Sequence, residues 1–218
     1  MTEKFKYGLI GSSGRLGLEV KNVFSENGNE LVYSYALEGE TKKTKPELII
    51  DCSLPDVFNK TISLVKEYGI PLVMATTGLS PEQIQKLKDI GNSVPVVQSF
   101  NYSVGIQILL KLVSIAHEKL PDWDVEIEEI HHRFKKDKPS GTAKMIQNIF
   151  SEKDVNVSSL RLGNIAGDHI VHFGGLGEVI SIKHSATSRR TFAEGILKSA
   201  EFVIEKKKGF YTFSDVIW

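Results

Sequence analysis

The chain has 218 residues, of which 41% are hydrophobic and 25% are charged, and its 27 Lys and Arg residues equal its 27 Asp and Glu residues. This length can bury a sizeable core, and the composition is typical of a soluble globular protein. The balanced charge does not indicate a protein that binds nucleic acid or an anionic membrane, so any anion site must be local.

Cysteine content and hydropathy predict a cytoplasmic protein. Cys52 is the single cysteine and cannot form an intramolecular disulfide. The most apolar region, residues 104–116, is interrupted by Gln107 and Lys111 and is shorter than the roughly 20 apolar residues that a transmembrane helix needs. No secretory leader is recognised, and we therefore expect no membrane association.

The first predicted strand runs directly into a glycine-rich turn. Residues 6–10 predict the strand, residues 11–17 (GSSGRLG) form the turn, and an amphipathic helix then extends to about Asn27. Such a unit suits a dinucleotide pyrophosphate, because glycines let the backbone approach phosphate and the helix amides point at it. The spacing is G-x-x-G-x-x-G rather than G-x-G-x-x-G, and the alternative is a tight connection without a ligand.

The second predicted strand, residues 30–37, ends at Glu38, where a carboxylate can accept a hydrogen bond from an adenosine ribose hydroxyl. That feature favours NAD. Arg15 and three lysines beyond the strand could instead neutralise a 2′-phosphate and favour NADP, or the lysines could form a solvated run; they are Lys42, Lys43 and Lys45. We therefore expect NADH or NADPH as the cofactor.

Strands and helices then alternate. Residues 46–53, 71–77 and 94–100 predict strands, and Ser80 begins a capping box with Gln83. This alternation is typical of an α/β fold with a Rossmann-type, doubly wound parallel sheet. The carboxyl ends of such strands bind ligands.

The pattern changes after residue 103. A long helix over residues 104–120 and three alternating strands predict an α+β unit with an open mixed or antiparallel sheet, and a closing helix follows. We predict a dinucleotide-binding domain over residues 1–103, completed by residues 190–218. We predict a substrate-binding and oligomerisation domain over residues 104–189.

Residues 128–143 (EEIHHRFKKDKPSGTA) combine proton donors, cations and a helix start. The alternation slips at Glu128 and Glu129, which predicts a bulge. Extended backbone past this point would place His131 and Lys135 on one strand face. Adjacent histidines on a strand point apart, so we predict no metal site.

The sequence Ser140-Gly141-Thr142 predicts the start of a helix. Its free amides would bind an anion, although Ser140 by itself could be only an N-cap. The neighbouring histidines and lysines favour the anion site. We predict structural or exposed positions for His169, His172 and His184.

Five segments in order resemble the 4-hydroxy-tetrahydrodipicolinate reductase (dihydrodipicolinate reductase) family: GSSGRLG, ATTG, FNYSVG, HHRFKKDKPSGTA and TSRRTFAEG, at residues 11–17, 75–78, 100–105, 131–143 and 187–195. The resemblance implies an NAD(P)H-dependent oxidoreductase of lysine and diaminopimelate biosynthesis. It also implies a Rossmann domain, a substrate domain whose open sheet pairs subunits, and a homotetramer.

The resemblance also implies roles for individual residues. His131 matches the family's proton donor, and Lys135 matches its catalytic lysine. The substrate-binding matches are His132, Ser140, Gly141, Thr142, Arg189 and Phe192. The cofactor-binding matches are Gly11, Ser13, Gly14, Arg15, Leu16, Glu38, Ala75, Thr76, Thr77, Ser99, Phe100, Asn101 and Tyr102.

The implied chemistry is hydride transfer from the nicotinamide to a small dicarboxylate substrate, a cyclic imine, with a proton supplied by His131 as the domains close. A histidine suits proton transfer near neutral pH. One alternative is another two-domain nicotinamide-dependent amino-acid dehydrogenase. The other is a non-catalytic NAD(P)H-binding redox sensor, which would not need the cluster of histidine, lysine, serine, glycine and threonine.

Overall fold

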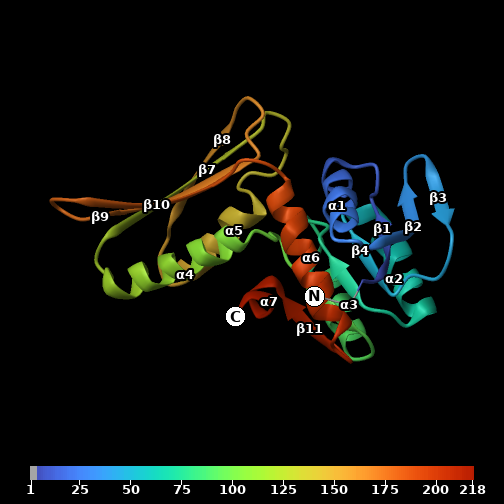
Figure 1. Cartoon of the computed structure of the whole chain (residues 1–218). Helices are drawn as coiled ribbons and strands as arrows, with labels where there is room; N and C mark the ends of the chain where they lie inside the picture. Colours follow the sequence, from blue (N-terminus) through green and yellow to red (C-terminus); the bar gives the residue numbers. More distant parts are fainter. Residues whose placement is uncertain (1–3) are drawn as a thin grey trace. The chain divides into compact units, whose positions relative to one another are not determined.

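A computed structural model describes residues 4–218, and the chain divides into two compact units (Figure 1). The first unit holds the residues up to Tyr102 together with Arg189–Trp218, and the second is Ser103–Ser188. Within the described part of the chain, no helix is both long and apolar enough to cross a membrane.

The first unit contains a seven-stranded sheet in the order β11-β6-β5-β4-β1-β2-β3. Its strands are β1 (Lys6–Ile10), β2 (Glu30–Ala36), β3 (Gly39–Lys42), β4 (Leu48–Asp51), β5 (Leu72–Met74), β6 (Pro95–Gln98) and β11 (Gly209–Thr212). All neighbouring pairs are parallel except β2 and β3, which form a hairpin. The strand order reverses at β1, and a ligand of such a sheet binds beside that reversal.

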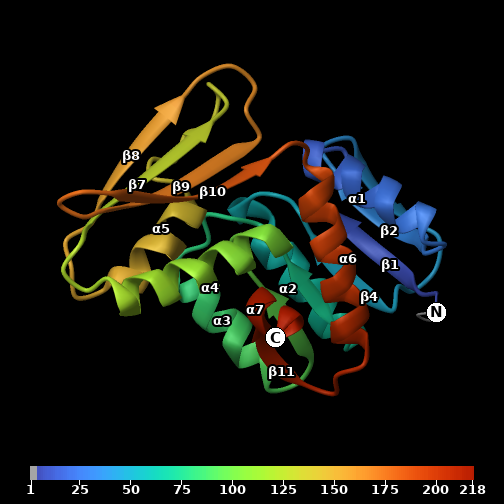
Figure 2. The ribbon, with the colours of Figure 1, turned by 60° about the vertical axis from the view of Figure 1, so that its left-hand side comes forward.

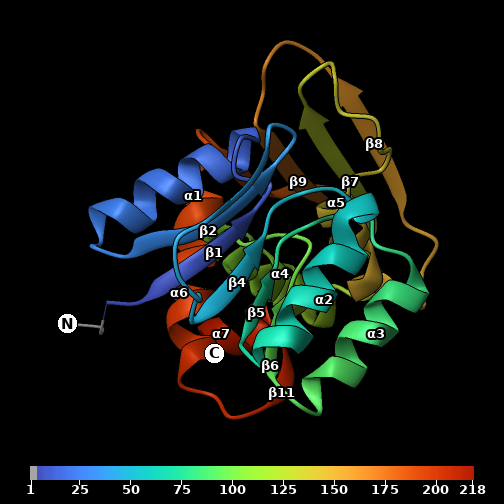
Figure 3. The same cartoon turned by 90° about the vertical axis from the view of Figure 1, so that its right-hand side faces the viewer.

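Helices cover both faces of this sheet (Figure 3). They are α1 (Arg15–Glu26), α2 (Phe58–Tyr68) with the short 3-10 turn η1 (Pro55–Val57) before it, α3 (Pro81–Gly91), α6 (Arg190–Ile204) and α7 (Phe213–Ile217). α1 and α6 pack together on one face, and α2 and α3 lie on the other. All four residues of β4 are buried, as expected for a central strand covered on both sides.

The second unit contains a four-stranded sheet in the order β10-β9-β7-β8 (Figure 2). Its strands are β7 (Asp124–His131), β8 (Asn156–Arg161), β9 (Gly167–Gly174) and β10 (Val179–Ala186). β7 pairs parallel with β8 and antiparallel with β9, so the sheet is mixed. Its helical elements, α4 (Val104–Lys119), α5 (Gly141–Gln147) and η2 (Asn148–Phe150), lie on one face. The predicted α/β fold with an open mixed sheet is confirmed.

Local signals begin and end several helices, and the capping box at Ser80 is one that the sequence predicts. Ser80 and Gln83 form a capping box with Pro81 in the first turn of α3. Ser103 caps α4, and Gly69 ends α2 with a φ of +62°. A left-handed residue at that position favours glycine, because a side chain would be strained there.

Candidate active site

The glycine turn after β1 is packed too closely for side chains. The amides of Gly11 and Ser12 donate to the carbonyl of Tyr35 at 2.8 and 3.2 Å. A Cβ on Gly17 would lie 2.1 Å from the Gly11 oxygen, and a Cβ on Gly11 would lie 2.7 Å from the carbonyl oxygen of Cys52. Glycine at both positions therefore lets the start of α1 approach the ends of β1 and β4.

The start of α1 fits a pyrophosphate. Gly14 is the N-cap of α1 and provides no side-chain hydrogen bond to the first amides of the helix. Those amides and the helix dipole attract an anion. Ser13, Gly14 and Arg15 are exposed there, so the turn brings the predicted pyrophosphate residues to one accessible place.

A buried carboxylate organises the carboxyl ends of β4 and β5. Asp51 accepts hydrogen bonds from the hydroxyls of Ser53, Thr61 and Thr76 at 2.5, 2.6 and 2.8 Å. Because the Thr76 hydroxyl also accepts from the Ser53 amide at 3.0 Å, that side chain is committed to the fold. Thr77, immediately after it, is exposed. Asp51 was not predicted as a site residue, although it ends a buried strand.

The segment after β6 is fixed in a similar way. The Tyr102 hydroxyl donates to the carbonyl of Met74 at 2.9 Å, and burial raises its pKa well above the ordinary value. The Ser99 hydroxyl donates to the carbonyl of Asn101 at 2.8 Å, and Phe100 between them is exposed. The predicted nicotinamide neighbours therefore follow β5 and β6, but the polar atoms of several of them are used to hold the strands together.

The hairpin after β2 separates the acidic residues from the lysines. Glu38 lies in the turn, and Glu40 pairs with Tyr35, whose carbonyl contacts the glycine turn. Lys42 pairs with Tyr33, two residues back along β2. The ammonium groups of Lys42 and Lys45 lie 5.3 and 5.9 Å from the centre of the Tyr68 ring, and Tyr68 ends α2. Both ammonium groups therefore lie beside the last residue of α2.

Arg189 and Phe192 belong to the first unit. Arg189 is the N-cap residue of α6, and burial together with the positive charge of Arg15 lowers its pKa. Arg189 thus lies near the glycine turn. Phe192 is half-buried in the first turn of α6.

In the second unit, β7 keeps a regular alternation through the positions where a bulge was predicted. Glu128 and Glu129 pair in register with Ile170 and His169. Glu129 is buried on the same face as His131. The predicted bulge was wrong: the slip in the hydrophobic pattern is a buried carboxylate at an inward position.

His131 is buried and held by that carboxylate. Its Nδ1 is hydrogen-bonded to Oε2 of Glu129. Arg161, on β8, donates to both oxygens of Glu129 at 2.7 and 2.8 Å. Because burial alone would raise the pKa of Glu129, the hydrogen bonds from His131 and Arg161 must outweigh it, and they hold the pKa well below its usual range.

The strand ends at His131, so the prediction that His131 and Lys135 share a strand face was wrong. His132, which is also buried, begins a turn closed by a hydrogen bond from the Lys135 amide to its carbonyl at 3.0 Å. The Lys135 ammonium forms an ion pair with Asp137 at 2.8 Å. Burial alone would raise the pKa of Asp137, but the hydrogen bond and the charge of Lys135 hold this pKa below its usual value. The two groups lie in the segment that follows the strand.

The predicted start of α5 is present. The Ser140 hydroxyl accepts from the Ala143 amide at 3.1 Å, and the Ser140 amide donates to Glu129 at 3.2 Å. His169 Nε2 lies 3.3 Å from the Ser140 hydroxyl, and the His169 ring centre lies 5.2 Å from that of His131. Burial and the charge of His131 lower the pKa of His169 to about 3.

Sequence reasoning missed three members of this cluster, which are Glu129, Arg161 and His169. The only sequence signal for these residues was the alternation of inward and outward positions along β7, β8 and β9. Gly141 and Thr142 follow Ser140 in the first turn of α5, so the structure brings these predicted substrate residues close to His131 through Glu129.

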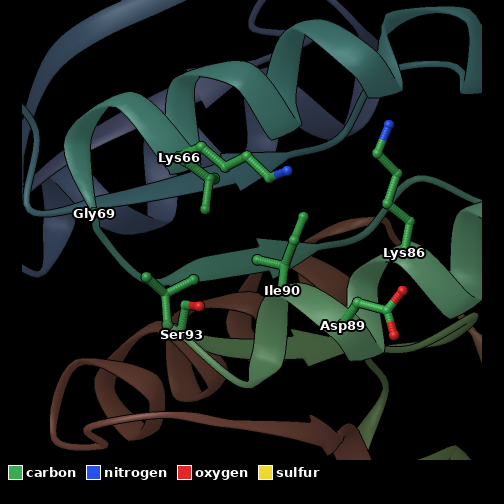
Figure 4. A pocket seen from close by; sticks show the side chains of 8 residues that line it. Lys66, Gly69, Lys86, Asp89, Ile90 and Ser93 are labelled. Atoms are coloured by element: carbon green, nitrogen blue, oxygen red, sulfur yellow. The ribbon is translucent and has the colours of Figure 1, made fainter.

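A pocket of about 580 Å³ lies elsewhere, between α2 and α3 (Figure 4). Lys66, Lys86, Asp89 and Ser93 line it, and none of the predicted site residues does. Among residues 4–218, no group of three or more His, Cys, Asp or Glu side chains could hold a metal ion.

Comparisons with known proteins cover almost the whole chain. A family model described as "Dihydrodipicolinate reductase, N-terminus" matches residues 5–102, and "Dihydrodipicolinate reductase, C-terminus" matches residues 105–217. A 4-hydroxy-tetrahydrodipicolinate reductase of Thermosipho africanus is 45% identical over 212 residues, which are 97% of each chain. One from a Nitratiruptor species is 34% identical and covers 96% of this chain and 98% of its own.

A solved structure has the same fold. It is a dipicolinate-bound dihydrodipicolinate reductase from a Paenisporosarcina species, with a TM-score of 0.77 and 23% identity, covering 96% of this chain and 98% of its own. The two family models and the relatives identify the family of this chain, and the solved structure has the same fold. The chain belongs to the dihydrodipicolinate reductase family.

Proposed function

We propose that this chain catalyses the NAD(P)H-dependent reduction of 4-hydroxy-tetrahydrodipicolinate, via dihydrodipicolinate, to tetrahydrodipicolinate in diaminopimelate and lysine biosynthesis. Its family is one of reductases that use NADH or NADPH. The observation that carries the proposal is His131, a buried imidazole held at Nδ1 by the carboxylate of Glu129. Such a ring can exchange a proton only through Nε2.

The residues divide the proposed reaction between them. The nicotinamide cofactor, when bound, supplies the hydride. His131, protonated on both nitrogens, gives the Nε2 proton to the substrate carbon that carries the negative charge of the resulting carbanion or enamine. The imidazole is then neutral and keeps its proton on Nδ1. The Lys135 ammonium and the first turn of α5 hold the substrate carboxylates. Fixed positive charge there stabilises the negative charge that develops as the substrate is reduced.

A coupled assay tests the proposal. Pyruvate, aspartate semialdehyde and the enzyme that condenses them would generate the substrate in place, and cofactor oxidation would be followed by absorbance. We expect oxidation that depends on this chain and on both substrates. No oxidation with either NADH or NADPH would contradict the proposal and favour a protein that only binds the cofactor.

We expect this enzyme to prefer NADH. The 2′-phosphate of NADPH would approach the end of β2, where Glu38 and Glu40 lie, and Lys60 is already paired with Glu40 at 2.7 Å. Repulsion of about 1 kcal/mol between exposed charges corresponds to about fivefold in KM. Steady-state KM values for NADH and NADPH measure this preference. Glu38→Gln should bring the two KM values closer together, while Lys43→Ala should not. A lower KM for NADPH would contradict this reading of the hairpin.

We also propose a cytoplasmic homotetramer. The edge strands β8 and β10 carry the exposed apolar side chains of Leu160, Val179 and Ile180, which supports burial against another copy. Sedimentation equilibrium measures the assembly directly, and a monomeric mass at micromolar concentration would contradict the proposal.

A further inference from the structure

Glu129 and Arg161 form a buried ion pair, here called the Glu129–Arg161 pair, that the proposed reaction does not use directly. The Glu129 side chain is 0% exposed and that of Arg161 is 7% exposed. Glu129 lies on β7 and Arg161 at the end of β8, where Arg161 pairs in register with His131. The pair therefore lies beside the proposed proton donor.

The Glu129 carboxylate connects three parts of the proposed site. Its Oε2 is hydrogen-bonded to Nδ1 of His131 and accepts from Nη1 of Arg161 at 2.8 Å. Its Oε1 accepts from Nη2 of Arg161 at 2.7 Å and from the amide of Ser140 at 3.2 Å. One carboxylate thus contacts the proton donor, a fixed cation and the first turn of α5.

The Arg161 guanidinium connects the same carboxylate to the turn that carries Lys135. Its Nε donates to the carbonyl of Lys135 at 3.2 Å, and Nη2 donates to the carbonyl of Asp137 at 2.5 Å. Nη1 also donates to the carbonyl of Leu160 at 2.6 Å. A guanidinium has five N–H groups, and these three contacts with the two to Glu129 use all of them.

Stability alone is a weak reason for this arrangement. Removing two charges from water is costly, and apolar residues of similar volume often stabilise a fold as well as a buried ion pair does. The directions of the hydrogen bonds offer another reason. An ionised carboxylate only accepts, so it requires a proton on Nδ1 of His131 and leaves Nε2 for the substrate.

The surroundings of Nε2 fit that assignment. A Cβ on Gly167, on β9, would lie 3.0 Å from Nε2 of His131. The absence of a side chain at Gly167 therefore keeps this nitrogen uncovered on that side. The ring is fixed through Nδ1, and a side chain at position 167 would crowd Nε2.

We propose that Glu129 and Arg161 are positioning residues of the reductase: Glu129 fixes the ring and tautomer of His131, and Arg161 fixes both Glu129 and the turn that carries Lys135. The inference rests on the proposed function and assigns no contact with substrate to either residue. It makes the two catalytic side chains depend on one buried ion pair.

Removing both charges of the pair at once leaves the local net charge unchanged. A variant without the pair therefore tests the positioning of His131 and Lys135 rather than the charge around them.

The double variant Glu129→Leu/Arg161→Met tests the proposal, because it removes the ion pair without leaving a buried charge unpaired. We expect cooperative thermal unfolding and unchanged NADH binding by fluorescence titration. We expect kcat to fall by at least about 100-fold, as for a misplaced catalytic group. A kcat within about threefold of wild type would overturn the proposal.

Glu129→Asp is the second variant, should the double variant not fold. It keeps the charge but withdraws the carboxylate by about one bond length, so we expect a folded protein with kcat lowered by about tenfold or more. Undiminished kcat in this variant would overturn the proposal. The matched control is Glu126→Gln on the same strand, where the carboxylate is hydrogen-bonded to Ser158 at the surface, and it should retain wild-type rates.

Two measurements separate this inference from the proposed function. If the wild-type protein reduces no substrate, the proposed function fails, whereas an active wild type with an equally active double variant defeats only the inference. Nitrogen NMR of labelled imidazole rings in the substrate-free protein, assigned with His131→Gln, reports the tautomer independently of activity. We expect the proton on Nδ1 of neutral His131 in the wild type and loss of that preference in the double variant; a proton on Nε2 in the wild type would overturn the proposal.

Discussion

Replacing His131 by glutamine should lower kcat by about 10²- to 10⁴-fold, the usual contribution of a positioned general acid. Glutamine can still accept or donate a hydrogen bond toward Glu129, but its amide does not give up a proton at neutral pH. The cofactor is expected to bind the first unit, so its affinity should be unchanged. Single-turnover reduction in the coupled assay, together with NADH titration, measures both quantities.

His172→Gln provides the control for that variant. His172 lies on β9 of the same sheet, and its Nδ1 is hydrogen-bonded to the exposed hydroxyl of Ser181 at 2.8 Å. The same chemical change there removes a histidine without touching the cluster around Glu129. A His131→Gln enzyme with near wild-type kcat would remove His131 from the proposed mechanism, whichever rate the control has.

The parts of the fold that the sequence predicted are those with local causes. The glycine turn requires close packing within a few residues of chain, since Gly17 contacts the Gly11 carbonyl. The capping box of α3 needs only Ser80 and Gln83. A helix start or a tight turn is determined by neighbours in sequence, so residue types at fixed spacing reveal it.

Two of the three strands that the sequence missed depend on partners far along the chain. In β8 the burial alternates between exposed and half-buried positions, and among residues 4–218 its only partner strand is β7, about thirty residues away. β3 is an exposed four-residue strand that exists because it pairs with β2. β11 pairs with β6 from more than a hundred residues away. None of these three strands carries the strongly periodic apolar pattern that predicts a strand by itself.

The candidate site shows the same division. His131, Lys135 and Ser140 could be recognised because they are close in sequence and resemble a family motif. Glu129 was interpreted as part of a bulge, because a carboxylate facing the core is costly unless a cation meets it. That cation, Arg161, lies on the unpredicted strand β8. The sequence pattern therefore did not reveal Arg161, the cation that makes burial of the Glu129 carboxylate possible.

Replacing Lys135 by methionine should lower kcat/KM by about 10²- to 10³-fold with little loss of stability. The backbone at Lys135 is held by His132 and Arg161, so methionine changes only the end of the side chain, and the Asp137 carboxylate left behind is 53% exposed and stays hydrated. Lys135→Arg keeps the charge and should recover part of the rate, while Lys136→Met, an exposed neighbour, should match wild type. Initial rates over a range of substrate concentrations measure the effect. Equal losses in Lys135→Met and Lys136→Met would mean that general attraction of an anionic substrate, rather than a fixed ammonium, accounts for the role of this turn.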